Sequence, residues 1–90
     1  DRYVAQIKQA IESNLLKPSN YQKGQYCVYS VQLAPGGVVI DAKLIHASGN
    51  PALDQAARVA IYRTSPLPVP KDPALFDRFR VLRLTLNPYQ

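Results

Sequence analysis

The stretch Leu33–Ala57, LAPGGVVIDAKLIHASGNPALDQAA, holds two local signals that decide the fold. The first is Pro35-Gly36-Gly37, which separates two runs of alternating apolar residues and predicts a tight hairpin turn. Pro35 fixes its own backbone angle, and the glycines can adopt the positive φ that joins neighbouring strands compactly. The second is Gly49-Asn50-Pro51, in which Asn50 is the expected N-cap of a helix and Pro51 its first residue. The stretch therefore predicts a strand pair followed by a capped helix.

Length and composition predict one small domain. The chain has 90 residues, of which 47% are hydrophobic, so we expect a single core over residues 1–90. No apolar run reaches the roughly 18 residues needed to cross a membrane, and no signal peptide is recognisable. The chain begins at Asp1 and leads at once into a helical pattern. We therefore expect a domain excised from a longer protein, with any targeting or anchoring segment outside it.

On the N-terminal side of the hairpin turn, the spacing of apolar residues predicts a helix over about residues 2–16, with Tyr3, Ile7, Ala10, Ile11 and Leu15 on one stripe. Residues 26–33 then alternate as a strand. Its expected buried face carries Cys27, Tyr29, Val31 and Leu33.

After the turn, residues 38–45 alternate as a second strand. We expect Val38, Ile40, Ala42 and Leu44 to point into the core. We expect the other set, Val39, Asp41, Lys43 and Ile45, to point outward.

The C-terminal half predicts a helix, an extended segment and a last strand. Residues 51–63 form an alanine-rich helix that can pack closely on a sheet. Residues 64–73 contain four prolines and predict an extended strap over the core, with an SH3-type ligand as the alternative interpretation. A helical turn over Ala74–Arg78, capped by Asp72, precedes a strand over residues 80–86. The fold class is α+β: a three-stranded antiparallel sheet with helices on one face and two open edges.

The charge pattern argues against nucleic-acid binding and is typical of general solubility together with attraction to acidic partners. The formal net charge is +5 and the pI is near 9.6. Most basic residues are scattered along the chain, and only Arg78, Arg80 and Arg83 cluster. Specific nucleic-acid binders concentrate charge on one element, so nucleic-acid binding is a minor alternative, testable by a salt series.

No residue set indicates catalysis, a metal or a cofactor. The carboxylates are not paired, and the hydroxyl residues lack the context of a nucleophile. His46 is the only histidine, so a histidine-cysteine metal site is not expected. Cys27 is the only cysteine, so we expect a free, buried and unreactive thiol. We therefore expect a chain that is not an enzyme and holds no cofactor.

Four stretches of the chain resemble the TolA C-terminal periplasmic domain family. They are the opening helix Tyr3–Ser13, the first hairpin from Cys27 to Gly37, the helix start Gly49–Ala57 and the proline strap after it. The related TonB C-terminal domains share the hairpin and the Leu-Asp-X-Ala-Ala helix, but typically begin with an extended Tyr-Pro segment that this chain lacks. A TonB-type energy transducer that contacts outer-membrane transporters is therefore the second interpretation. TolA domains of enteric bacteria also join the first-strand cysteine to one in the central helix, where this chain has Asp54.

The resemblance implies a non-enzymatic coupling module of the Tol–Pal cell-envelope system. Such a domain lies in the periplasm of a Gram-negative bacterium, on a protein anchored in the inner membrane beside TolQ and TolR. It binds TolB, with Pal as a further partner, and supports outer-membrane integrity and constriction at division. Filamentous phage minor coat proteins and group A colicins use the same domain for entry. We expect the isolated domain to be monomeric.

The expected mechanism of binding is strand addition to a sheet edge. The strand order that fits the resemblance is 2-1-3, which leaves residues 38–45 and 80–86 as the two edges. The candidate binding residues are the outward side chains of these strands: Val39, Asp41, Lys43, Val81, Arg83 and Thr85.

Overall fold

A computed structural model of the chain describes residues 2–16, 18–20 and 22–87. The elements follow in the order α1 (Arg2–Ser13), β1 (Cys27–Ala34), β2 (Val38–His46), α2 (Pro51–Thr64), α3 (Pro73–Phe76), a 3₁₀ turn η1 (Asp77–Phe79) and β3 (Val81–Leu86). The molecule is elongated, with extents of 41 × 21 × 18 Å.

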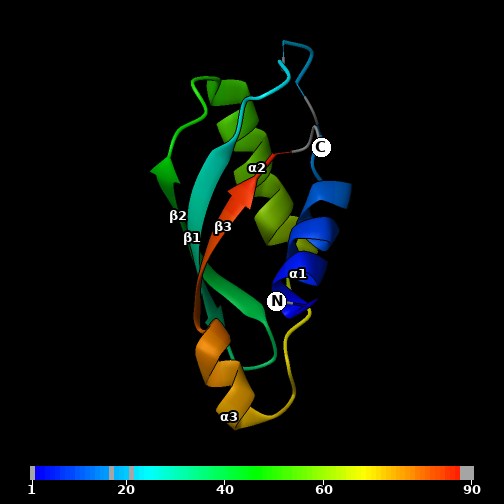
Figure 1. Ribbon diagram of the computed structural model, residues 1–90, viewed down its shortest axis with the longest axis vertical. Coiled ribbons are helices and arrows are strands. Elements are labelled where there is room, and N and C mark those ends of the chain that lie inside the picture. Colours follow the sequence, from blue (N-terminus) through cyan, green and yellow to red (C-terminus); the bar gives the residue numbers. More distant parts are fainter. Residues whose placement is uncertain (1, 17, 21, 88–90) are drawn as a thin grey trace.

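The sheet is antiparallel with the order β2-β1-β3, so the predicted fold class and strand order are confirmed. Both α1 and α2 cover the same face of this sheet (Figure 1). The helix layer is tied together where the Asn14 side-chain amide donates to the Thr64 hydroxyl at 2.9 Å. The core lies between the layers and includes Ile7, Ile11, Val31, Leu53, Ile61 and Leu84. In the part of the chain that the structure describes, the other face of the sheet carries no helix.

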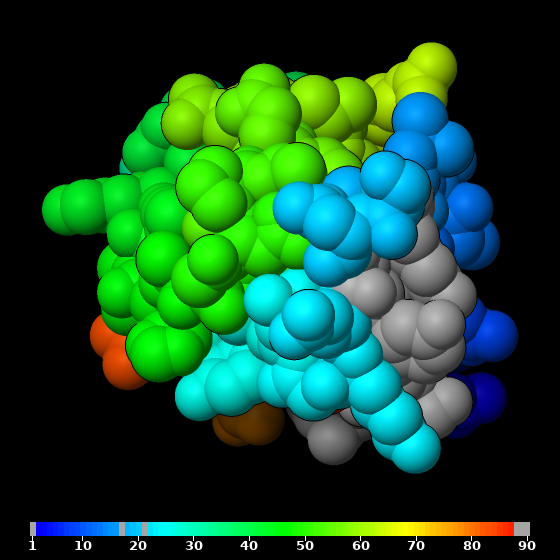
Figure 2. Space-filling model, turned by 90° about the horizontal axis from the view of Figure 1, so that it is seen from above, coloured from blue at the N-terminus to red at the C-terminus, as the bar shows by residue number. Residues whose placement is uncertain are grey.

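The capped start of α2 matches the prediction. The Asn50 side-chain oxygen accepts the N–H groups of Ala52 and Leu53, and Pro51 occupies the first helical position. The Asn50 amide donates in turn to the side chains of Asn20 and Gln25, in the loop before β1. Figure 2 looks onto this end of the molecule, where residues of that loop pack against the start of α2. One asparagine thus caps the helix and anchors the loop.

The proline strap docks on the hairpin turn. Leu67 is buried, and its N–H donates to the carbonyl of Gly37 at 2.7 Å. Gly37 has φ +87°, and a Cβ atom at this position would lie 2.1 Å from the carbonyl oxygen of Leu67. The second glycine of the turn is therefore needed both for its backbone angle and for the close approach of the strap.

The first helix ends earlier than expected. The apolar stripe predicted a helix to about residue 16, whereas α1 ends at Ser13. The hydroxyl of Ser13 donates to the carbonyl of Ala10, and the N–H groups of Asn14 and Leu15 donate to carbonyls three residues earlier. Three-residue bonds of this kind tighten the last turn and still leave Leu15 buried.

The faces expected for the second strand were wrong at its start. The pairing with β1 shifts between Gln32 and Leu33, so that Ile40 has no partner on β1. A one-residue bulge reverses the alternation on its far side, which buries Val39 and leaves Val38 and Ile40 about half exposed. A second shift, between Val28 and Tyr29, leaves Ile45 unpaired. Ala42 is buried as predicted, whereas Leu44 is 38% exposed.

Candidate interaction edges

β3 is a regular, unbulged edge strand. Its pairing with β1 runs without a shift from Gln32↔Val81 to Cys27↔Leu86. The N–H of Leu33 donates to the carbonyl of Arg80, which fixes the hydrogen-bonded pairs at alternate positions. The backbone groups of residues 82, 84 and 86 therefore point to β1, and those of Val81, Arg83 and Thr85 point to the open edge.

β2 is the more irregular edge. It carries the two bulges, which interrupt the row of outward backbone groups. At its start, the N–H of Val39 donates to the hydroxyl of Ser65 at 3.1 Å, so that the strap covers this donor. By the alternation of pairs, the backbone groups of Ala42 and Leu44 point to the edge, while those of Asp41 and Lys43 point to β1.

The six candidate residues divide into three groups. Val81, Arg83 and Thr85 have exposed side chains on the open face and outward backbone groups, so both properties expected of an edge residue come together. Asp41 and Lys43 have exposed side chains only, because their backbone groups pair with β1. Val39 was expected to point outward, but its side chain is 9% exposed and belongs to the core, because of the bulge at Ile40.

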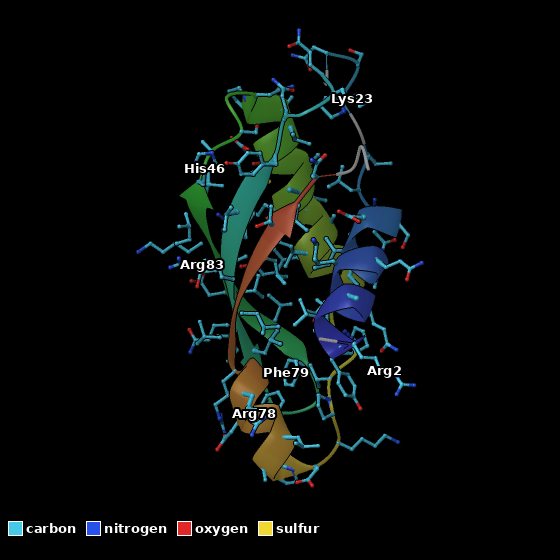
Figure 3. All side chains as sticks on the ribbon, viewed as in Figure 1. Arg2, Lys23, His46, Arg78, Phe79 and Arg83 are labelled. Carbon is cyan, nitrogen blue, oxygen red and sulfur yellow. The ribbon has the colours of Figure 1, made fainter. Side chains whose placement is uncertain are left out.

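The register brings candidate residues of the two edges into rows across β1. Lys43 and Arg83 lie on either side of Ser30, and Asp41 and Val81 lie on either side of Gln32. Figure 3 shows Arg83 and His46 on the side of the sheet that faces away from α1. His46 stacks on Tyr26, with ring centroids 4.9 Å apart. The open face is thus a mixed surface of aromatic, apolar, polar and charged side chains.

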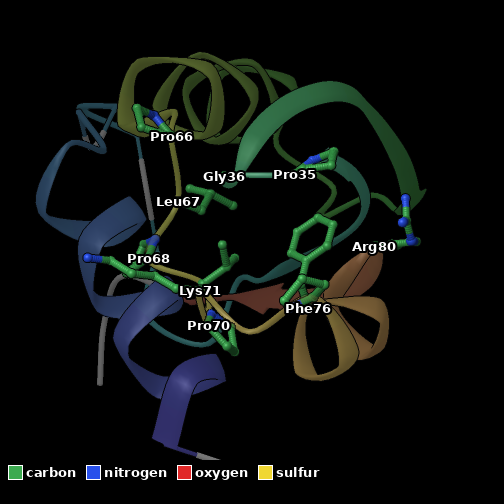
Figure 4. Close-up of a pocket in the computed structure, with 11 residues that line it drawn as sticks. Pro35, Gly36, Pro66, Leu67, Pro68, Pro70, Lys71, Phe76 and Arg80 are labelled. Carbon is green, nitrogen blue, oxygen red and sulfur yellow. The ribbon is translucent and has the colours of Figure 1, made fainter.

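A cavity that the sequence did not predict lies under the strap. It has a volume of about 560 Å³ and an apolar lining that includes Pro35, Leu67, Val69, Pro70 and Phe76. Figure 4 shows Pro35, Leu67, Pro70 and Phe76 around the hollow, with Lys71 and Arg80 at its rim. The alternating prolines were the available signal, because a stiff extended segment cannot collapse onto the core as a helix would.

The buried thiol of Cys27 is free, as predicted. Burial, with the nearby charge of Asp54 as a smaller cause, raises the pKa of Cys27 to about 12. Burial is also the main reason that the pKa of Tyr29 is raised to about 12. Both groups are therefore neutral near pH 7, and a protonated, buried thiol is a poor nucleophile.

Asp54 lies where the resemblance places the second cysteine of a disulfide. In this chain, hydrogen bonds of Asp54 connect α2 to its neighbours at that position. Its carboxylate accepts the N–H of Ser48 at 3.1 Å, and its backbone carbonyl accepts the hydroxyl of Tyr29 at 2.7 Å. The start of α2 is thereby tied to β1 and to the preceding loop.

Within residues 2–16, 18–20 and 22–87, no group of three or more His, Cys, Asp or Glu side chains is arranged to hold a metal ion. None of the helices in these stretches is long and apolar enough to cross a membrane.

Comparison with known proteins gives one consistent result. The family model described as TolA C-terminal matches residues 1–86. A solution NMR structure of TolAIII bound to a peptide derived from the N-terminus of TolB has a TM-score of 0.84 and 20% identity, over 98% of this chain and 73% of that one. A second structure, from work on protein–protein interactions and the importance of the hydrophobic cavity of the TolA C-terminal domain, has a TM-score of 0.72 and 25% identity. It covers 94% of this chain and 85% of that one.

Proposed function

This chain belongs to the TolA C-terminal family, a family of interaction domains rather than enzymes, and we propose on that basis that it binds an extended N-terminal segment of TolB. In this proposal the chain is the periplasmic end of an inner-membrane-anchored protein. It couples TolQ and TolR, through parts outside this chain, to TolB and Pal at the outer membrane. The same surface serves filamentous phage coat proteins and group A colicins. The result is support for envelope integrity and division.

The observation that carries the proposal is the regular open edge of β3. Val81, Arg83 and Thr85 each offer one N–H and one C=O to a neighbour, so an added strand can form up to about six hydrogen bonds. Each is worth about 0.5–1.5 kcal/mol net, and only together with apolar contacts of the partner's side chains do they reach roughly micromolar affinity after the costs of association. Reversible binding of this strength suits a coupling link, and its low demand on side chains admits several partners.

β3 is the favoured edge for physical reasons. Bulges on an edge strand discourage pairing, and β2 has two of them together with a strap-covered N–H. An incoming strand on β3 would meet an uninterrupted row. The candidate residues of β2, Val39, Asp41 and Lys43, would then lie outside the primary contact, with Lys43 reaching it only across the open face.

The proposal is tested by titrating the isotope-labelled domain with a synthetic peptide of the TolB N-terminus from the same bacterium. We expect saturable chemical-shift changes with a dissociation constant of about micromolar order. A scrambled peptide is the control, and a TonB-box peptide tests the transducer alternative. No binding of the TolB peptide, or tighter binding of the TonB-box peptide, would contradict the proposal.

A further inference from the structure

Arg83 lies at the centre of the β3 edge, and no carboxylate of the described residues forms an ion pair with it. Its side chain is exposed on the open face, and its backbone groups point to the edge. Among the described residues it has no ion-pair partner, because the one ion pair of those stretches joins Arg80 to Asp77 at 2.6 Å.

The neighbours of Arg83 add to this positive charge. Across β1, the residue in line with Arg83 is Ser30, and the next in line is Lys43. Asp41, a carboxylate on the same face, lies in the adjacent row beside Gln32. The row that ends at Arg83 therefore presents two cations and a hydroxyl group.

We propose that Arg83 makes the β3 edge selective for a partner strand that carries a carboxylate side chain directly opposite it. The inference rests on the proposed binding by strand addition. A residue opposite Arg83 on an added antiparallel strand has its side chain on the same face, with Cβ atoms about 5 Å apart. A carboxylate at this position would form an ion pair with Arg83 and balance part of the positive charge of the row. Its neighbours along the strand point to the helix face, where apolar side chains extend the core.

The same charge disfavours a second copy of the chain as the occupant. Two β3 strands can pair antiparallel with full overlap in the register that places residue 81 opposite 85 and Arg83 opposite Arg83. Like charges directly opposite each other destabilise a strand pair. The regular edge is thus protected from self-association by one arginine, a known use of charge on edge strands.

The test uses the TolB N-terminal peptide and variants in which each Asp or Glu is replaced in turn by its amide. We expect one of these amide replacements, the one opposite Arg83, to weaken binding to the wild type about fivefold at low salt. The same replacement should leave the affinity for Arg83→Gln unchanged. A peptide with Lys at that position is expected to bind Arg83→Glu better than it binds the wild type. Arg63→Gln is the matched control, because it removes an exposed cation from α2.

The outcomes separate the two proposals. If the wild type binds the TolB peptide and Arg83→Gln binds it equally well at low salt, the selectivity inference is overturned and strand binding stands. If the wild type does not bind the peptide, the proposed function fails, and sedimentation then decides the inference. In that case the inference requires that Arg83→Gln self-associates at a lower concentration than both the wild type and Arg63→Gln. If all three proteins self-associate at the same concentration, the inference is overturned.

Discussion

Gly37 sets how closely the strap can approach the hairpin. In Gly37→Ala the new Cβ would lie 2.1 Å from the Leu67 carbonyl oxygen, so the strap must move and the 2.7 Å hydrogen bond is lost. We expect Gly37→Ala to be less stable than Gly36→Ala by about 2 kcal/mol or more in denaturant unfolding. Gly36 is the matched control, because it has φ +90° and open space around its Cβ position.

Both substitutions share the strain of a positive φ, about 1–2 kcal/mol, so their difference isolates the contact with the strap. Equal stabilities would show that the strap does not hold its place on the turn.

The buried Cys27 and Tyr29 predict a loss of stability in alkaline solution. The thiol ionises at 9.0 in the unfolded chain but at about 12 in the folded protein, and the phenol moves from 10.0 to about 12. The unfolded chain therefore loses protons first, so the free energy of unfolding is unaffected below about pH 9 and falls as the pH rises toward 12.

Denaturant unfolding of Cys27→Ala across this pH range measures the contribution of the thiol. We expect the variant to lose less stability than the wild type between pH 9 and 12. An equal loss would place the titrating group elsewhere.

Single residues show which local signals were readable in the sequence. The caps at Asn50 and Asp72 were predictable because side-chain capping depends on a few adjacent residues. The burial of Val39 was not, because it depends on a bulge that the alternation of residues 38–45 does not reveal.

At the scale of elements, the two edges differ in regularity, and this difference predicts the effect of proline. Thr85→Pro removes an outward N–H of β3 and leaves the bonds between β3 and β1 in place. We expect this variant to fold and to lose at least about tenfold in affinity for the TolB peptide, since a hydrogen bond is lost and the ring obstructs the incoming strand.

Thr85→Val controls for the side chain, and Leu44→Pro makes the corresponding change on β2. If Leu44→Pro weakens binding and Thr85→Pro does not, β2 is the edge in use. If no proline on either edge weakens binding, strand addition is the wrong mechanism.

The helices and strands themselves were largely predictable, because each has its own spacing of apolar residues and is bounded by turn or capping residues. The third strand alternates cleanly, and all three of its inward leucines, Leu82, Leu84 and Leu86, are buried. The prolines indicate a stiff strap, but the position and walls of the cavity under it were not predictable, because the hairpin turn, the strap and α3 meet only in the tertiary fold.

The whole molecule has one core, to which the sheet, the helices and the strap all contribute, and its stability comes from that core. We expect a free energy of unfolding of about 5–10 kcal/mol, as for other small domains. We also expect no change in melting temperature when a chelator is added. A decrease of many degrees would reveal a metal on which the fold depends. A monovalent salt of equal ionic strength is the control.

Function was readable in the sequence through the family and much less through chemistry. Composition and motifs excluded catalytic arrangements but did not select a partner, because an open sheet edge is a backbone property that any sequence can present. The edge that is free of bulges and strap contacts became visible only with the register of β2 and β3 on β1.

The central claim is that a partner strand adds to β3, and amide hydrogen exchange of the domain with and without the TolB peptide tests it most directly. We predict that the peptide slows exchange at the outward N–H groups of Val81, Arg83 and Thr85. Those of Leu82, Leu84 and Leu86 already pair with β1 and should change little. Saturable binding that leaves Val81, Arg83 and Thr85 unprotected, or that protects Ala42 and Leu44 instead, would contradict the account.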